Sequence, residues 1–279
     1  MSSATSDENH HESITPSASQ GQKNDPLHRI RTAGSISIPP ELFEQLYLSP
    51  QNRVKGELRQ TFGNPTPLGN TPLSMVMMGW QGAGGLDAAN VGSMVFLGGL
   101  LLILGAVGEW ILGNTYPATV FGIFGGFWFS FGATLEPSFN AYGAYSPDPS
   151  DPAKGMNAIF FATFGFFLIA VLIILIILGI ASIRTNICFF SLFALFIPAV
   201  GCLTGSFFSL AQGNAVSATR LQHVGAGLLL AASLIGFYIF IALVLASVDF
   251  PIVIPLGDLS TVIKGAKDKI EARNNPGTA

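Results

Sequence analysis

Six long apolar stretches separated by polar connections dominate the chain from about residue 69 to residue 247. Each is close to the roughly 20 residues that an α-helix needs to cross the hydrocarbon core of a bilayer. The first stretch is the least apolar, because Asn70, Pro72 and Gln81 interrupt it, and we expect it to depend on neighbouring helices. The pattern predicts an all-α membrane protein whose six transmembrane helices cover residues 69–86, 91–112, 117–138, 157–182, 187–210 and 222–247.

Composition supports this class and divides the chain. Hydrophobic residues make up 49% of the 279 residues and charged residues only 10%, against about 25% charged in soluble domains. Residues 1–60 are polar and rich in Ser, Asn, Gln and Pro, which predicts a mostly disordered tail. We therefore expect an N-terminal tail over 1–60, a transmembrane domain over 61–250 and a second tail over 251–279.

The basic residues indicate the orientation in the membrane. With six spans, eleven of the thirteen lysines and arginines fall on one side, and Lys154 and Arg220 fall on the other. Because basic residues accumulate on the cytoplasmic side, both termini are expected in the cytoplasm. We expect the membrane to be the plasma membrane.

The sequence offers little that points to other classes of protein. It contains no P-loop, no Ser/His/Asp set and no Cys/His spacing typical of a metal site, so we expect no enzyme, no cofactor and no metal. It has no basic face with interleaved aromatic residues, so we expect no nucleic-acid partner.

The segment Asn64-Pro65-Thr66-Pro67-Leu68-Gly69 precedes the first apolar stretch. Prolines fit the first turn of a helix, where backbone N–H groups lack partners and the helix dipole is positive. That arrangement suits a small anion, with Asn64 and Thr66 as polar side chains beside it. The alternative is that Asn64 only caps the helix and Pro65 occupies its first position.

Carboxylates inside a membrane are costly and are therefore candidates for function. Glu109 lies near the end of the second span and Glu136 near the end of the third. Glu136 could relay protons or repel anions, and each could instead be an interfacial group that bonds to a helix end or to water. Asp87 and Asp249 lie at the ends of segments, where we expect them to face water.

Small and aromatic residues predict helix contacts. Gly122 with Gly126 and Gly201 with Gly205 have the spacing of close-approach faces, although chance spacing is the alternative in a chain with 32 glycines. Phe124 belongs to an aromatic stripe on the third span, which predicts packing against neighbours or, alternatively, a pore wall.

Several motifs, read together, resemble the acetate uptake transporter family (AceTr), and the long polar tail resembles its fungal members. The likeness covers roughly residues 60–260. It rests on Asn64 to Gly69, Glu109-Trp110 with Gly113-Asn114-Thr115, Gly125-Gly126-Phe127-Trp128, Phe189-Phe190-Ser191-Leu192, and Pro255-Leu256-Gly257-Asp258.

The resemblance implies a six-helix protomer in a hexameric ring, with a substrate path inside each protomer. It implies transport of acetate and similar short monocarboxylate anions together with protons. Two alternatives follow from the same family: a non-transporting acetate sensor on this scaffold, or an exporter of ammonium or ammonia.

The resemblance also implies which side chains narrow the path: Leu73, Phe124 and Leu192. At several positions this chain departs from the usual family residue, so polar groups are lost from the path and others are gained. Leu73 replaces Phe, Phe124 replaces Tyr, Leu102 replaces Gln, Asn70 replaces Leu, Ile239 replaces a polar residue and Glu136 replaces an apolar one.

Overall fold

The computed structural model describes residues 67–259, 262–263 and 265, and its regular structure is helical. No strand occurs among these residues, where the single β-bridge joins Asn186 to Asp258. The helices are α3 (Pro67–Met77), α4 (Leu101–Ile111), α5 (Thr115–Leu135), α6 (Ala158–Ser182), α7 (Ile187–Ala211) and α8 (Ala215–Ser247). A π-helix, η4 (Ser93–Leu100), runs directly into α4, and the short 3-10 turns are η2 (Trp80–Gly82), η3 (Gly85–Asn90), η5 (Pro137–Phe139), η6 (Gly143–Tyr145) and η7 (Pro152–Gly155).

Five helices in the described part of the chain are long and apolar enough to cross a bilayer. They are η4 with α4 (19 residues), α5 (21), α6 (25), α7 (25) and α8 (33). These helices correspond to five of the six predicted spans and confirm an all-α membrane protein. The sixth, the first along the chain, is represented by α3, whose described length is 11 residues.

The predicted first span therefore ends earlier than its apolar pattern suggested. After Met77 the backbone takes left-handed conformations at Gly79 (φ 70°), Gln81 (φ 55°) and Gly82 (φ 78°), which no α-helix contains. Glycines are frequent in this segment, and they adopt such conformations at little steric cost. The chain turns here and returns to the membrane-length helices at Ser93.

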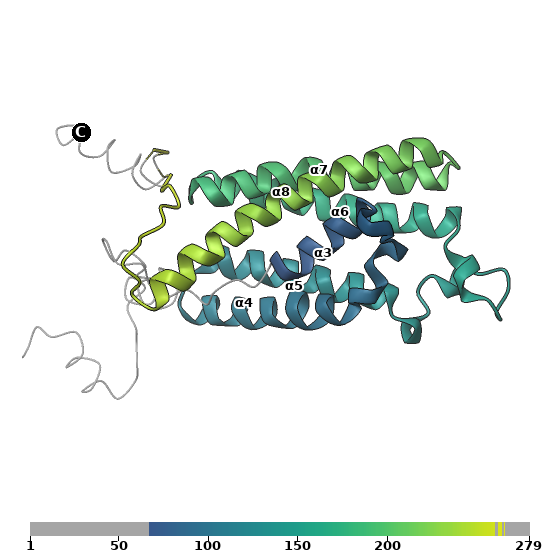
Figure 1. Cartoon of the computed structure of the whole chain (residues 1–279), viewed down its shortest axis with the longest axis horizontal. Helices are drawn as coiled ribbons and strands as arrows, with labels where there is room; N and C mark the ends of the chain where they lie inside the picture. Colours follow the sequence, from purple (N-terminus) through teal and green to yellow (C-terminus); the bar gives the residue numbers. More distant parts are fainter. Residues whose placement is uncertain (1–66, 260–261, 264, 266–279) are drawn as a thin grey trace, which may run out of the picture. The chain divides into compact units, whose positions relative to one another are not determined.

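The short helix α3 lies between α8 and the α4–α5 pair (Figure 1). Its start packs on Gly236 of α8, where an added Cβ would lie 3.1 Å from Pro67 Cγ. Its end is held by Gln222, whose Nε2 donates to the carbonyl oxygen of Met77 at 2.8 Å. The C-terminal carbonyls of a helix lack partners within that helix, so this bond also completes the helix end.

Asparagines mark the starts of three long helices. Asn157 Oδ1 accepts from the backbone N–H of Ile159 at 3.0 Å, and Asn186 Oδ1 and Asn214 Oδ1 cap α7 and α8 in the same way. An asparagine cap satisfies N–H groups that the first turn leaves open. The cap at Asn214 starts α8 seven residues before the predicted residue 222, because helix formation tolerates polar residues that the apolar pattern excluded.

Close helix approach uses only part of the predicted glycine pairs: a Cβ on Gly205 would lie 3.2 Å from Leu221 Cδ1 of α8. A Cβ on Gly126 or Gly201 would meet nothing within 4 Å in the chain, whereas one on Gly98 would lie 2.8 Å from Trp128 Cγ. Gly98 belongs to η4 and Trp128 to α5, so the indole ring packs directly on the η4 backbone. The pair of helices η4–α4 and α5 is therefore joined through Gly98 and its neighbours.

We expect Gly98→Ala to lower the thermal midpoint of the detergent-solubilised protein. The added methyl group would overlap the buried ring of Trp128, and overpacking of this kind costs about 1–3 kcal/mol. The matched control is Gly201→Ala, which has open space and should keep or raise the midpoint because alanine favours helix. Equal midpoints for both variants would contradict this packing.

Candidate functional site

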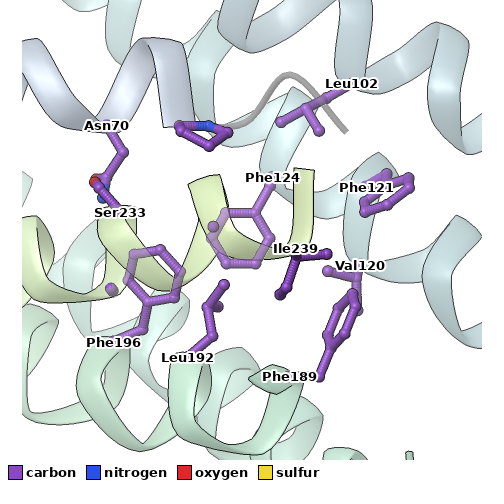
Figure 2. Close-up of a pocket in the computed structure, with 13 residues that line it drawn as sticks. Asn70, Leu102, Val120, Phe121, Phe124, Phe189, Leu192, Phe196, Ser233 and Ile239 are labelled. Carbon is purple, nitrogen blue, oxygen red and sulfur yellow. The ribbon is translucent and has the colours of Figure 1, made fainter. Parts of the chain in front are cut away.

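A small cavity of about 40 Å³ lies between α3, α4, α5, α7 and α8 (Figure 2). Aromatic and aliphatic side chains make up most of its wall, with Phe124 near its centre in the view. One water needs about 10–15 Å³ of such space, so the cavity has room for about three waters or a molecule of roughly four heavy atoms. The lining residues are Pro67, Asn70, Leu102, Val120, Phe121, Phe124, Phe189, Leu192, Phe196, Ala232, Ser233, Gly236 and Ile239.

A hydrogen-bonded pair, Asn70 with Ser233, provides the polar part of this wall. Asn70 Nδ2 donates to Ser233 Oγ at 2.7 Å and to the carbonyl oxygen of Leu229 at 3.0 Å. Ser233 Oγ in turn donates to the Leu229 carbonyl at 3.0 Å. Both side chains are almost fully buried, with 5% and 3% of their surface exposed. A buried amide without partners would be costly, so these bonds also hold α3 on α8.

A larger cavity of about 230 Å³ lies next to the small one and is mostly apolar. Side chains of α6, among them Phe167 and Leu175, complete its wall. Asn70, Phe124 and Phe196 line both cavities and therefore separate them. The rings of Phe124 and Phe196 are 5.4 Å apart, which is contact distance for an aromatic pair.

The structure relates the three predicted neck residues to these cavities. Phe124 lines both, Leu192 lines the small cavity, and Leu73 lines the larger one. Phe124 thus shares one cavity with each of the other two residues, and the predicted narrowing at these side chains stays a prediction. Asn64 and Thr66, predicted beside the entrance, lie outside the described residues.

Four positions where the chain departs from the usual family residue line the small cavity: Asn70, Leu102, Phe124 and Ile239. Three of them lose a polar group and one gains it, so polarity is concentrated at Asn70. Sequence reasoning did not identify its partner Ser233, because one serine within a long apolar helix carries no pattern. It also missed Phe196, whose place at the wall depends on how α7 rotates against α5.

The carboxylates lie away from both cavities in the described residues. Glu136 follows the last residue of α5, where Ser138 Oγ lies 3.4 Å from its Oε1, so its predicted role at the path stays a prediction. Glu109 is buried at the end of α4 and accepts a hydrogen bond from Asn114 Nδ2 at 2.6 Å. This bond joins the end of α4 to the start of α5.

The expectation that Asp87 faces water is wrong. It lies in η3, between α3 and η4, and only 1% of its surface is exposed. One carboxylate oxygen accepts a hydrogen bond from Asn90 Nδ2, and the other, Oδ2, has no partner in the structure. Burial raises the pKa of this carboxyl group, and the bond from Asn90 opposes that effect. Its position at a segment end suggested exposure, but the left-handed turn at Asp87 (φ 70°) directs the side chain inward.

The fold and the cavities define a class: a multi-pass helical membrane protein with two adjoining, mostly apolar cavities and one buried polar pair in their wall. Residues 47–261 match the model of the GPR1/FUN34/yaaH family, and the chain belongs to this family. The match confirms the resemblance found in the motifs. It also confirms that the chain is not an enzyme, since relatives of the chain are named as an acetate transporter and an acetate permease.

Similar proteins occur in fungi, among them two species of Aspergillus. Protein alcS of Aspergillus fumigatus is 39% identical over 234 residues, covering 81% of this chain and 86% of that protein. The acetate transporter protein patA of Aspergillus clavatus is 31% identical over 205 residues, covering 71% and 79%. Among solved structures, the bacterial acetate channel SatP aligns with a TM-score of 0.49 at 20% identity, covering 72% of this chain and all of that one.

We expect Asp87→Asn to raise the thermal midpoint at pH 7. A raised pKa in the folded state means that Asp87 stabilises the fold only while protonated, and that this contribution is lost as pH rises through the raised pKa. The advantage of the variant should therefore shrink as the pH is lowered toward about 4, near the pKa of an exposed Asp. Asparagine tolerates the left-handed backbone and can still accept from Asn90.

The control for this measurement is Asp148→Asn in the exposed loop before α6. Hydrogen bonds from Ser150 and Lys154 lower the pKa of Asp148, so its contribution to stability changes with pH in the opposite direction to that of Asp87. It contributes stability above the pKa of an unfolded Asp and loses it as pH falls, so Asp148→Asn should give no gain at pH 7. A gain of equal size in both variants would contradict the assignment to burial.

Proposed function

We propose that this protein carries acetate or a similar short monocarboxylate across a membrane, together with protons. The observation that supports it most is the pair of adjoining cavities, which share Asn70, Phe124 and Phe196 in a chain of this family. The small cavity suits a molecule of about acetate's size. The relative patA is named an acetate transporter, which favours the same substrate here.

Energetics favours coupling to protons. Bringing an unpaired carboxylate into a low-dielectric site costs at least several kcal/mol, and no Lys, Arg or His lines either cavity in the described residues to offset it. Protonating the acid at one pH unit above its pKa costs only about 1.4 kcal/mol. The path is therefore more easily crossed by an anion that has taken up a proton.

The proposed path begins at the first turn of α3, where Asn64 and Thr66 would meet the solute in its water. It continues through the small cavity beside Leu192, passes Phe124, and enters the larger cavity beside Leu73. Glu136 would act at the far end, where it could exchange protons with water. In this proposal the narrow point at Phe124 limits both the rate and the size of the solute.

The setting of the path is part of the proposal. The tails, residues 1–60 and 251–279, lie in the cytoplasm, and residues 61–250 cross the plasma membrane. Eleven basic residues on the side of the termini support this orientation. The protomers assemble into a hexameric ring in which each protomer has its own path.

The direct test is uptake of labelled acetate by cells of a host that lacks its own acetate carrier. We expect uptake that depends on the protein and rises as the external pH is lowered from about 7 to about 5, because more of the acid is then protonated. Delivery to the membrane is checked with a C-terminal fluorescent tag. Normal delivery without uptake would contradict transport and favour a sensor, whereas ammonia efflux in the same cells would favour an exporter.

Truncation of the side chain at the narrow point should widen the path. We expect Phe124→Ala, which joins the two cavities, to raise uptake of butyrate relative to acetate roughly three- to tenfold, the effect of about 1 kcal/mol on a barrier. The matched control is Phe166→Ala on α6, because Phe166 is 66% exposed and lines neither cavity. The path is wrongly placed if both variants keep the relative uptake of the parent protein.

A further inference from the structure

The hydrogen bonds of Asn70 determine which of its atoms a solute can use. Its amide group has two N–H hydrogens, and both are donated to α8: one to the carbonyl oxygen of Leu229 and one to Ser233 Oγ. A carbonyl oxygen only accepts, so the atom that faces Leu229 must be the nitrogen and the amide cannot be reversed. The oxygen Oδ1 is therefore the polar atom of this side chain that remains for a ligand.

This oxygen is an acceptor without a donor. No N–H or O–H group in the described part of the chain donates to Asn70 Oδ1. Asn70 is 95% buried and lines both cavities, so a solute that moves between them passes beside it. A molecule that brings its own donor would complete the hydrogen bonding of a buried polar group.

The other hydroxyl groups at the cavities offer no spare hydrogen. Ser233 donates to the Leu229 carbonyl, and Ser130, in the wall of the larger cavity, donates to the Gly126 carbonyl at 2.8 Å. The indole nitrogen of Trp128 has no partner in the structure, but it is itself buried and closed off from the cavity. Among the described lining residues of α3 to α8 there is no Asp, Glu, His, Lys or Arg.

A wall of this kind discriminates between the two forms of a carboxylic acid. The anion has only acceptor oxygens, which the Asn70 oxygen repels and which no cationic side chain at the cavities compensates. The undissociated acid has an O–H group that donates and a short apolar part that fits against Phe124 and Leu192. We propose that Asn70 selects the undissociated acid, which donates its O–H hydrogen to Asn70 Oδ1 as it passes.

This inference rests on the proposed transport function and specifies the species that crosses. The anion takes a proton from water on the entry side, crosses as the neutral acid, and releases the proton to water on the exit side. No bond to the protein forms, and each anion moves with one proton, so net charge transfer is zero. The backbone N–H groups at the start of α3 would instead favour the anion, and the two possibilities differ in their response to voltage.

The test uses the full-length protein in liposomes, with labelled acetate and a valinomycin-imposed potassium potential. Uptake into protein-free liposomes is subtracted at each pH, because acetic acid crosses lipid by itself. At fixed total acetate we expect the protein-dependent rate to fall about tenfold for each pH unit above the pKa of the acid and to be independent of the potential. Acetamide, a neutral molecule with N–H donors, should inhibit, and methanesulfonate, a permanent anion, should not.

Two variants test Asn70 itself. Asn70→Leu restores the usual family residue and removes one buried hydrogen bond to the solute. It should raise roughly tenfold both the acetate concentration for half-maximal uptake and the acetamide concentration for half-maximal inhibition. Ser233→Ala keeps Oδ1 but frees one N–H of Asn70, so methanesulfonate should begin to inhibit. The control is Thr163→Val on the exposed face of α6, which should behave as the parent protein.

Each outcome decides between the claims. Uptake driven by an inside-positive potential and blocked by methanesulfonate overturns selection of the neutral acid and leaves transport standing. An unchanged response to acetamide in Asn70→Leu overturns the role of Asn70; should that variant fail to fold, the parent protein and Ser233→Ala still decide. No uptake above protein-free liposomes at any pH overturns transport itself.

Discussion

A buried amide in an apolar bundle must find partners, and this requirement at Asn70 organises the centre of the molecule. Its two bonds, to the Leu229 carbonyl and to Ser233, join a helix of 11 described residues to one of 33 residues. A helix as short as α3 gains little from its own backbone and depends on contacts with its neighbours. The amide, the Pro67–Gly236 contact and the Gln222 bond supply three of those contacts along one side of α8.

The position of α3 in turn shapes both cavities. The helix α3 ends at Met77, and its described part is shorter than the long helices around it. Its residues Asn70 and Leu73 line the cavities. Gly69 lets α3 approach α5 closely, since a Cβ there would lie 3.2 Å from Trp128 Cε2. The polar pair and the ring of Phe124 therefore face the same space. Loss of polarity at Leu102 and Ile239 leaves Asn70 and Ser233 as the polar side chains of the small cavity.

Much of the fold could be predicted from hydropathy, because lipid requires long apolar helices and the sequence shows their lengths directly. The ends of the helices were harder to predict. The end of α3 depends on left-handed residues from Gly79 onward, and the start of α8 depends on the Asn214 cap within a polar stretch. The glycines that join helices could be predicted only in part, since spacing alone does not tell which face of a helix meets a neighbour. Gly205 lies close to Leu221, but Gly126 is open, and Gly98, which contacts Trp128, was not predicted.

At the site, motif positions led to Phe124, Leu192 and Leu73, and to the altered positions Asn70, Leu102 and Ile239. What the sequence could not provide was the pairing of Asn70 with Ser233, 163 residues away, and with it the direction of the amide. Because the amide nitrogen of Asn70 bonds to α8, the polar atom that this side chain leaves for a ligand is a hydrogen-bond acceptor. The inward direction of the Asp87 side chain could not be predicted either, because it depends on the left-handed backbone at that residue.

The central claim is that a short carboxylic acid passes between the two cavities beside Asn70 and Phe124. A structure of the purified protein soaked with 3-bromopropionic acid near pH 4, where much of this weaker acid is undissociated, tests it directly, because bromine is located by its anomalous scattering. The account predicts bromine in the small cavity or at Phe124, with the carboxyl group within hydrogen-bonding distance of Asn70 Oδ1. Bromine bound only outside these cavities, with Asn70 Oδ1 bonded to another group of the protein, would contradict it.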